Sequence, residues 1–186
     1  SLGDHGGQAQ GRRRRRIAND NLDPAAFEAF VRAWGHNLLT CVDGAIYIAM
    51  SSKELPLLCR VLAEEGGHWS DTLIWAKDRF TLGRADYQHR YEPIWYSWRE
   101  GSAHRWCGNR DQADVWEIPR PAEAPLHPTM KPLALMERAF SNSSRSGDLV
   151  ADFFAGSGST LIAAERTGRR CDALELDPIY SHYIAM

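Results

Sequence analysis

The stretch LVADFFAGSGSTLIAAERTGRRCDALELDP, residues 149–178, carries the most informative pattern in the sequence. Its apolar beginning predicts a buried strand, and Gly156-Ser157-Gly158 predicts a tight turn into a helix that ends at Gly168. Glycine permits positive φ and lets a ligand approach the backbone, while the first turn of a helix presents free N–H groups. The stretch therefore predicts a ligand site where a strand turns into a helix.

An acidic residue follows at a distance that suits an adenosine ligand. Glu175 lies 19 positions after Gly156 (175 − 156), close to the spacing of about 20 at which an acid binds ribose hydroxyls. Leu161 stands where a dinucleotide-binding motif has its third glycine. This favours an adenosine ligand without phosphates, and S-adenosylmethionine fits that description. An ordinary strand–turn–helix without a ligand is the alternative.

The composition indicates one globular α/β domain. The chain has 186 residues, of which 44% are hydrophobic and 25% charged, enough for a single core. The net charge of −2 argues against general attraction to nucleic acid, so a DNA site must be a local patch. No apolar run approaches the ~20 residues of a membrane span. The four cysteines lack metal-ligand spacing, so we expect no metal, no membrane and a reduced, cytoplasmic protein.

Helical and strand patterns alternate along the chain. Asp23 is a good N-cap residue, and Pro24 suits the first helical position. This alternation predicts a doubly wound, Rossmann-like α/β fold with a parallel sheet. Helices are expected over residues 22–39, 55–67, 131–144 and 159–168, and strands over 44–50, 68–77, 90–98, 148–154 and 169–176.

HPTMKP at 127–132, followed by GDLVADFFAGSGST and ELDPIY, resembles the C-terminal half of DNA amino-methyltransferases. It is similar to the permuted subgroup, in which the catalytic motif precedes the cofactor motif. ANDNLDPAAFEAFV, AIYIAMSS and LIWAKDRFTLGRADYQHRYEPIWYSW extend the resemblance over about residues 17–183. The resemblance implies methyl transfer from S-adenosylmethionine to an exocyclic amine of a base in double-stranded DNA. The expected target is N6 of adenine, and N4 of cytosine stays open.

The resemblance also implies roles for individual residues. Glu175 would hold the ribose hydroxyls, and Thr129, Lys131 and Pro132 would close the carboxylate end of the cofactor site. For Lys131, a solvated lysine at a helix start is the alternative. The loop around the cofactor would comprise Asp152, Phe153, Phe154, Ala155, Gly156, Ser157, Gly158, Ser159 and Thr160.

The family's catalytic motif, Asp or Ser followed by Pro-Pro and an aromatic residue, does not occur in this sequence. Such a motif accepts the hydrogens of the amine and stacks on the extruded base. LDPIY at 176–180 comes near, but Asp177 and Pro178 there are typical of a helix start. We therefore assign no catalytic residue and expect the motif upstream of residue 1. The fold would then lack its first strand, and this chain alone would have little or no activity.

Positive charge gathers in two parts of the chain. Residues 1–22 are expected to form a flexible basic arm, and 23–186 the methyltransferase domain, with a target-recognition insertion at about 79–126. The candidate DNA-binding residues are Arg12, Arg13, Arg14, Arg15, Arg16, Arg79, Arg84, Tyr87, Arg90, Arg105 and Arg110. A solvated, disordered run is the alternative for Arg12 to Arg16, and a β-hairpin edge with ordinary solvated arginines is the alternative for residues 77–92.

Other functions are compatible with the same cofactor-binding part of the sequence. A methyltransferase acting on RNA or a small molecule and an inactive DNA-binding fragment both remain open, whereas a nicotinamide enzyme is the weakest alternative. The protein is expected to be a monomer or homodimer.

Overall fold

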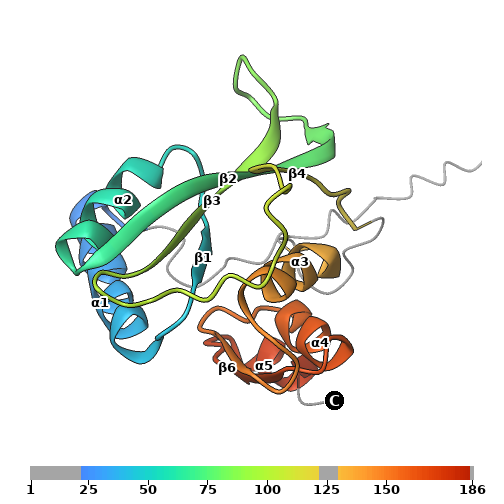
Figure 1. The fold of residues 1–186 in the computed structure, drawn as a ribbon. Coiled ribbons are helices and arrows are strands. Elements are labelled where there is room, and N and C mark those ends of the chain that lie inside the picture. Colours follow the sequence, from blue (N-terminus) through green and yellow to red (C-terminus); the bar gives the residue numbers. More distant parts are fainter. Residues whose placement is uncertain (1–21, 122–129, 185–186) are drawn as a thin grey trace, which may run out of the picture.

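The computed structural model describes residues 22–121 and 130–184. Arg12 to Arg16 and Thr129 therefore lie outside the described residues. Helices and strands alternate over most of the described chain (Figure 1). In chain order the elements are α1 (Pro24–Cys41), β1 (Ile46–Ala49), α2 (Leu55–Glu64), β2 (Gly67–Thr81), β3 (His89–Arg99), β4 (Val115–Glu117), α3 (Leu133–Ser143), β5 (Leu149–Asp152), α4 (Ser159–Arg166), β6 (Arg170–Ala173) and α5 (Pro178–Ile184).

The strands form two sheets rather than one. The larger sheet has the order β1-β3-β2-β4, and the smaller one contains β5 and β6. The expected parallel pairing is found between β5 and β6 and between β2 and β4. In contrast, β3 runs antiparallel to both β1 and β2. The loop between β2 and β3 is too short for a crossover helix, so these two long strands pair as a hairpin.

Helices cover both faces of the larger sheet. In Figure 1, α1 and α2 lie to the left of β1, and α3 lies to its right. One buried cluster joins Val31 of α1 and Leu58 of α2 to Ile46 and Trp95 of the sheet. On the other side, the cluster around Trp75 and Trp116 contains Leu135 of α3. The sheet is thus the middle layer of an α/β/α arrangement.

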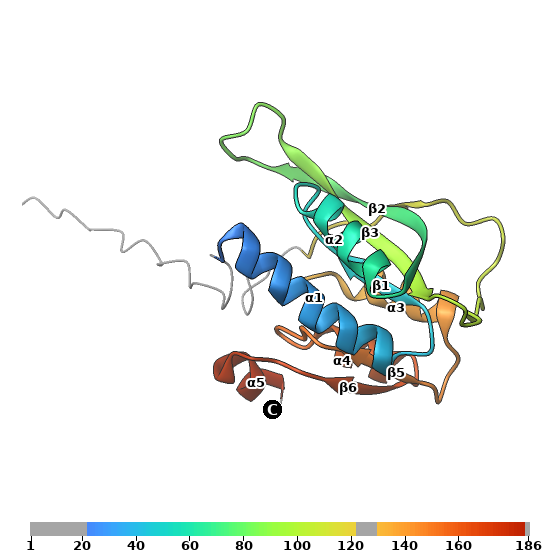
Figure 2. The same ribbon diagram turned by 90° about the vertical axis from the view of Figure 1, so that its left-hand side faces the viewer.

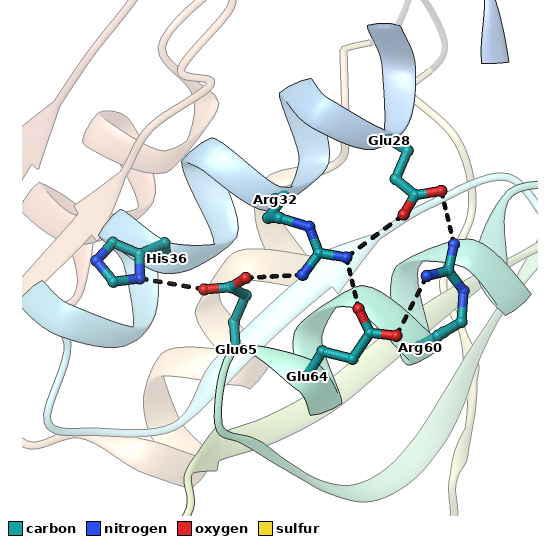
Figure 3. A network of polar contacts seen from close by, with 6 residues as sticks. All are labelled: Glu28, Arg32, His36, Arg60, Glu64 and Glu65. Carbon is teal, nitrogen blue, oxygen red and sulfur yellow. Dashed lines mark hydrogen bonds and ion pairs between the residues drawn. The ribbon is translucent and has the colours of Figure 1, made fainter. Parts of the chain in front are cut away.

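A network of ion pairs fastens α1 to α2 (Figure 3). The helices come close because Gly35 has no side chain, and a Cβ there would lie 2.7 Å from Leu62 Cδ2. Hydrogen bonds from Arg32 and Arg60 lower the pKa values of the glutamates in this network, which are Glu28, Glu64 and Glu65. Because these groups are exposed or only partly buried, each pair adds little stability by itself. The network comprises Glu28, Arg32, His36, Arg60, Glu64 and Glu65.

Local start signals match the helices that form. The Asp23 carboxylate accepts a hydrogen bond from the Ala26 amide at 2.9 Å, and Pro24 begins α1. Asp177 accepts one from the Ile179 amide at 2.9 Å at the start of α5. Strand β4 lies in a stretch that the sequence indicates as irregular, because its three residues are too few for a recognisable alternation.

Two buried tryptophans provide a test of the core. The Trp75 indole N–H donates to the Ile118 carbonyl at 2.7 Å, whereas the Trp95 N–H has no partner among the described residues. We expect Trp75→Phe to lower the free energy of unfolding by about 1 kcal/mol more than Trp95→Phe, because it leaves the partly buried Ile118 carbonyl without this donor. Urea unfolding of both variants measures the difference, and equal losses would contradict it.

Candidate cofactor groove at the glycine turn

A groove of about 840 Å³ runs between the two sheets. Its walls come from β1 on one side and from β5 with the following turn on the other. Helices α1 and α3 contribute the remaining walls, mostly through apolar side chains. A volume of this order is typical of sites for small organic ligands.

The turn that closes one end of the groove is held by Asp152. One oxygen of this carboxylate accepts a hydrogen bond from the Phe154 amide at 2.9 Å, and the other accepts one from the Thr160 hydroxyl. Gly156 and Gly158 have φ values of 55° and 84°, a backbone conformation that residues with a Cβ rarely adopt. The sequence expectation of a glycine-dependent turn agrees with this geometry.

Glu175, which follows the end of β6, closes the turn. Its two carboxylate oxygens accept hydrogen bonds from the Gly156 amide at 2.7 Å and the Asp177 amide at 2.8 Å. A carboxylate offers about four acceptor positions, so these bonds leave capacity for ligand hydroxyls. The parallel pairing of β5 with β6 brings Glu175 to this position, because both strands end at the same edge.

Most of the predicted cofactor loop lines the groove, together with Lys131. Gly158, Glu175 and Pro132 are not among the lining residues, although Glu175 bonds directly to the lining residue Gly156. The loop residues that line the groove are Asp152, Phe153, Phe154, Ala155, Gly156, Ser157, Ser159 and Thr160.

Aromatic side chains of α1 complete the pocket beside the turn. The Phe154 ring lies edge-on to Trp34, with centroids 5.6 Å apart, and to Phe30 at 6.3 Å. Both α1 residues line the groove. Sequence reasoning missed these two residues as site residues, because their helical spacing is equally typical of an ordinary apolar face.

Lys131 forms an ion pair at the rim of the groove. Its ammonium group lies 3.4 Å from one oxygen of Glu92, and the Lys77 ammonium lies 3.1 Å from the other. Lys77 also lies over the Trp75 ring, 4.6 Å from its centroid. Glu92 thus joins the hairpin formed by β2 and β3 to the segment that begins α3. The Lys131 side chain is thus ion-paired with Glu92 rather than simply solvated.

The hairpin of β2 and β3 extends beyond the body of the protein (Figures 1 and 2). Its tip presents Leu82 and Tyr87, which are 82% and 89% exposed, and Phe80 is also exposed. Arg79 and Arg84 are exposed in the same region, and the Arg90 side chain donates to the Lys77 carbonyl at 2.9 Å. The predicted residues Arg79, Arg84, Tyr87 and Arg90 are therefore brought together, and the apolar tip was not foreseen.

Arg105 and Arg110 lie away from this tip. Both follow the end of β3, whereas the tip precedes its start, and β3 is 11 residues long, or about 37 Å. Arg105 pairs with Asp148, just before β5, at 2.8 Å. The structure thus groups the hairpin residues with the rim at Lys131 and separates Arg105 and Arg110 from them.

Within residues 22–121 and 130–184, no group of histidine, cysteine and acidic side chains has the arrangement of a metal site. None of the helices in these ranges is both long enough and apolar enough to cross a membrane.

The chain belongs to the DNA methylase family of N6/N4 methyltransferases, whose model matches residues 10–186. Among curated proteins, it is 28% identical over 154 residues to the type II methyltransferase M2.DpnII of Streptococcus pneumoniae, covering 74% of this chain and 58% of that one. It is 27% identical over 180 residues to the DNA adenine methyltransferase YhdJ of Escherichia coli, covering 77% and 59%. The chain thus spans about three fifths of these relatives.

Solved structures share the fold. M1.HpyAVI in complex with S-adenosylmethionine matches with a TM-score of 0.73 and 23% identity, covering 84% of this chain and 81% of that one. The cytosine-N4-specific PvuII DNA methyltransferase matches with a TM-score of 0.77 and 16% identity, covering 92% and 73%. A DNA modification methylase of Thermus thermophilus, complexed with S-adenosylmethionine, has a TM-score of 0.65 and 25% identity, covering 86% and 75%. The expected Rossmann-like methyltransferase fold and the resemblance to DNA amino-methyltransferases are both confirmed.

Cys171 reports on the charge of Asp152 at the turn. Burial and, to a smaller extent, the nearby carboxylates of Asp152 and Asp172 together raise the pKa of this thiol to about 11. At pH 9 only about 1% of such a thiol is thiolate. We expect iodoacetamide to modify Cys171 much more slowly than the exposed Cys41, with the difference shrinking above pH 11.

Removing the charge of Asp152 tests this assignment further. Asp152→Asn should speed the alkylation of Cys171 at pH 9, because removing this negative charge lowers the pKa of the thiol. Peptide mass mapping follows each thiol, and Glu165→Gln on the exposed face of α4 is the control. An unchanged rate in Asp152→Asn would show that this carboxylate does not act on the thiol.

Proposed function

We propose that the groove binds S-adenosylmethionine, with its adenosine half beside Glu175 and its methionine half along the turn from Asp152 to Thr160. The observation that carries this proposal is the turn itself, where Glu175 bonds to the Gly156 amide at the rim of an apolar groove. The solved structures of M1.HpyAVI and the Thermus protein with S-adenosylmethionine support it.

The residues around the turn suit different parts of this ligand. Phe154, with Phe30 and Trp34 behind it, offers an apolar surface for the adenine or the sulfonium region. Lys131 offers a positive charge to the carboxylate of the methionine half, with Pro132 fixing the backbone beside it. Thr129 is proposed for the same end on the sequence resemblance alone.

The proposed reaction is methyl transfer to an exocyclic amine of a DNA base, with N6 of adenine as the target. The donor supplies a methyl group already activated by its sulfonium, so transfer depends on positioning and charge rather than on a covalent enzyme intermediate. YhdJ, a DNA adenine methyltransferase, supports adenine. Mass spectrometry of digested product DNA separates N6-methyladenine from N4-methylcytosine.

Double-stranded DNA is the proposed partner, and the hairpin of β2 and β3 its contact surface. Arginines beside exposed aromatic and apolar side chains suit phosphates and an extruded base. The ion pair of Glu92 with Lys131 supports this reading, because it sets the base of the hairpin next to the groove.

The remaining proposals concern organisation. We propose a target-recognition insertion over about 79–126 within a methyltransferase domain of residues 23–186, preceded by a basic arm of residues 1–22 with Arg12 to Arg16 on phosphates. Arg105 and Arg110 are proposed only as outer contacts. A cytoplasmic location and a monomer or homodimer complete the proposal.

Glu175→Ala tests the cofactor proposal. We expect S-adenosylmethionine to bind this chain, and the alanine substitution to weaken binding by about tenfold, or about 1.4 kcal/mol. The reason is the loss of both the acceptor for ribose hydroxyls and the bond that closes the turn. Isothermal titration calorimetry measures the affinity.

Glu165→Ala is the matched control, since it removes an exposed carboxylate of α4 and should bind as the unmodified chain does. Glu175→Gln separates the two causes of the loss, because an amide retains an acceptor without the charge. Equal affinity of the Glu175→Ala variant and the unmodified chain would rule out the assigned role.

The DNA surface is tested by salt dependence. Replacing Arg79 and Arg84 together by alanine should reduce the slope of log K against log salt by about 1.8, since each phosphate contact contributes about 0.9. Fluorescence anisotropy with a short DNA duplex, between about 50 and 200 mM salt, gives the slope. Arg166→Ala, which removes an exposed arginine of α4, serves as the control, and a wild-type slope in the double variant would refute the hairpin surface.

A further inference from the structure

One carboxylate at the base of the hairpin is shared between two ammonium groups. One oxygen of Glu92 lies 3.1 Å from the Lys77 ammonium, and the other lies 3.4 Å from the Lys131 ammonium. The side chains of Glu92, Lys77 and Lys131 are 24%, 16% and 29% exposed. Because two lysines share a single carboxylate, the three side chains together carry one excess positive charge at a partly buried site.

The two lysines are held unequally. The Lys77 ammonium donates a hydrogen bond to Glu92 and also lies over the Trp75 ring, 4.6 Å from its centroid, where the face of the ring attracts a cation. Lys131 makes the longer contact with Glu92 and is the more exposed of the two lysines. Lys77 is therefore the fixed partner of Glu92, and Lys131 is the exchangeable one.

Lys131 belongs to the groove as well as to this cluster. Of the described residues, Lys131 and Met130 line the groove, whereas Lys77 and Glu92 are not part of its lining. A lysine side chain is a flexible stem of four carbons that ends in three N–H donors. Rotation about the bonds of this stem can move the Lys131 ammonium from Glu92 to an anionic group in the groove, while the backbone before α3 stays in place.

We propose that Glu92 is a positioning residue of the cofactor groove, which holds Lys131 at the rim until the carboxylate of the ligand takes its place. This inference rests on the proposed function, in which Lys131 binds the carboxylate of the methionine half of S-adenosylmethionine. Glu92 and the ligand then compete for the same ammonium group. Lys77 stays on Glu92 during the exchange, so neither carboxylate is left without a cation at a partly buried site.

Competition for Lys131 distinguishes this role of Glu92 from that of a merely structural ion pair. Removing the charge of Glu92 frees Lys131, so it should favour a ligand that has a carboxylate over one that lacks it. S-adenosylmethionine and its decarboxylated form are a matched pair of ligands, because they differ only in this group. The quantity to compare is the ratio of their association constants, since a change in folding or in the shape of the groove affects both constants.

Glu92→Gln tests the proposal, because it keeps the size of the side chain and an acceptor for Lys77. We expect it to raise the ratio of the association constants by about threefold, the order of magnitude of one partly exposed ion pair. Lys131→Met, which keeps a long side chain without the charge, should lower the ratio by about tenfold. In the double variant, Glu92→Gln should cause no further change, because its effect passes through Lys131. Isothermal titration calorimetry with both ligands gives the constants.

Glu117→Gln is the matched control, since it removes an exposed carboxylate of β4 at the position that pairs with Ala76, next to Lys77. An unchanged or lower ratio in Glu92→Gln, or the same increase with and without Lys131, would overturn the proposal. If both ligands nevertheless bind and Glu175→Ala weakens both, the proposed cofactor site stands without this role of Glu92. If neither ligand binds, the proposed function fails and this inference fails with it.

Discussion

Two carboxylates hold the turn after β5, and the site depends on them. Asp152, at the end of β5, binds the Phe154 amide and the Thr160 hydroxyl, while Glu175, just after β6, binds the Gly156 amide. Hydrogen bonds to charged acceptors contribute about 1.5–3 kcal/mol each, which helps to fix a backbone path that passes twice through positive φ. The turn is thereby a preformed end wall of the groove.

The groove itself follows from how α1 and α3 are placed. Helix α1 packs on the larger sheet and touches Phe154 after β5, and helix α3 packs on the larger sheet and on α4. The distance between the sheets is therefore set by helix packing rather than by strand pairing. A space between two strand edges in one layer has strand-pairing groups on two sides and apolar side chains on the other two. The groove therefore combines main-chain polar groups with apolar walls, which suits a small organic ligand.

Local patterns in the sequence predicted the local features of the structure. Asp23 with Pro24, the glycines of the turn, and Asp177 with Pro178 act over a few positions, so their spacing alone identifies them. The antiparallel hairpin was predicted only as the alternative to a DNA-contact segment, because period-two patterns indicate a strand but not the direction of its neighbour. Contacts such as Phe154 with Trp34 join positions about 120 residues apart (154 − 34), and no local signal identifies them.

The ion pairs of Glu92 show how the groove and the hairpin are joined. Glu92 is half-buried and accepts two cations, Lys77 from its own hairpin and Lys131 from the rim of the groove. If Lys131 turns toward an anionic ligand, Lys77 still neutralises Glu92, so no carboxylate is left unpaired at a partly buried site, where the cost is high. The ion pair of Lys77 with Glu92 would thus leave Lys131 available to an anionic ligand in the groove. It also keeps the base of the hairpin, and with it the exposed arginines, at the end of the groove where the glycine turn lies.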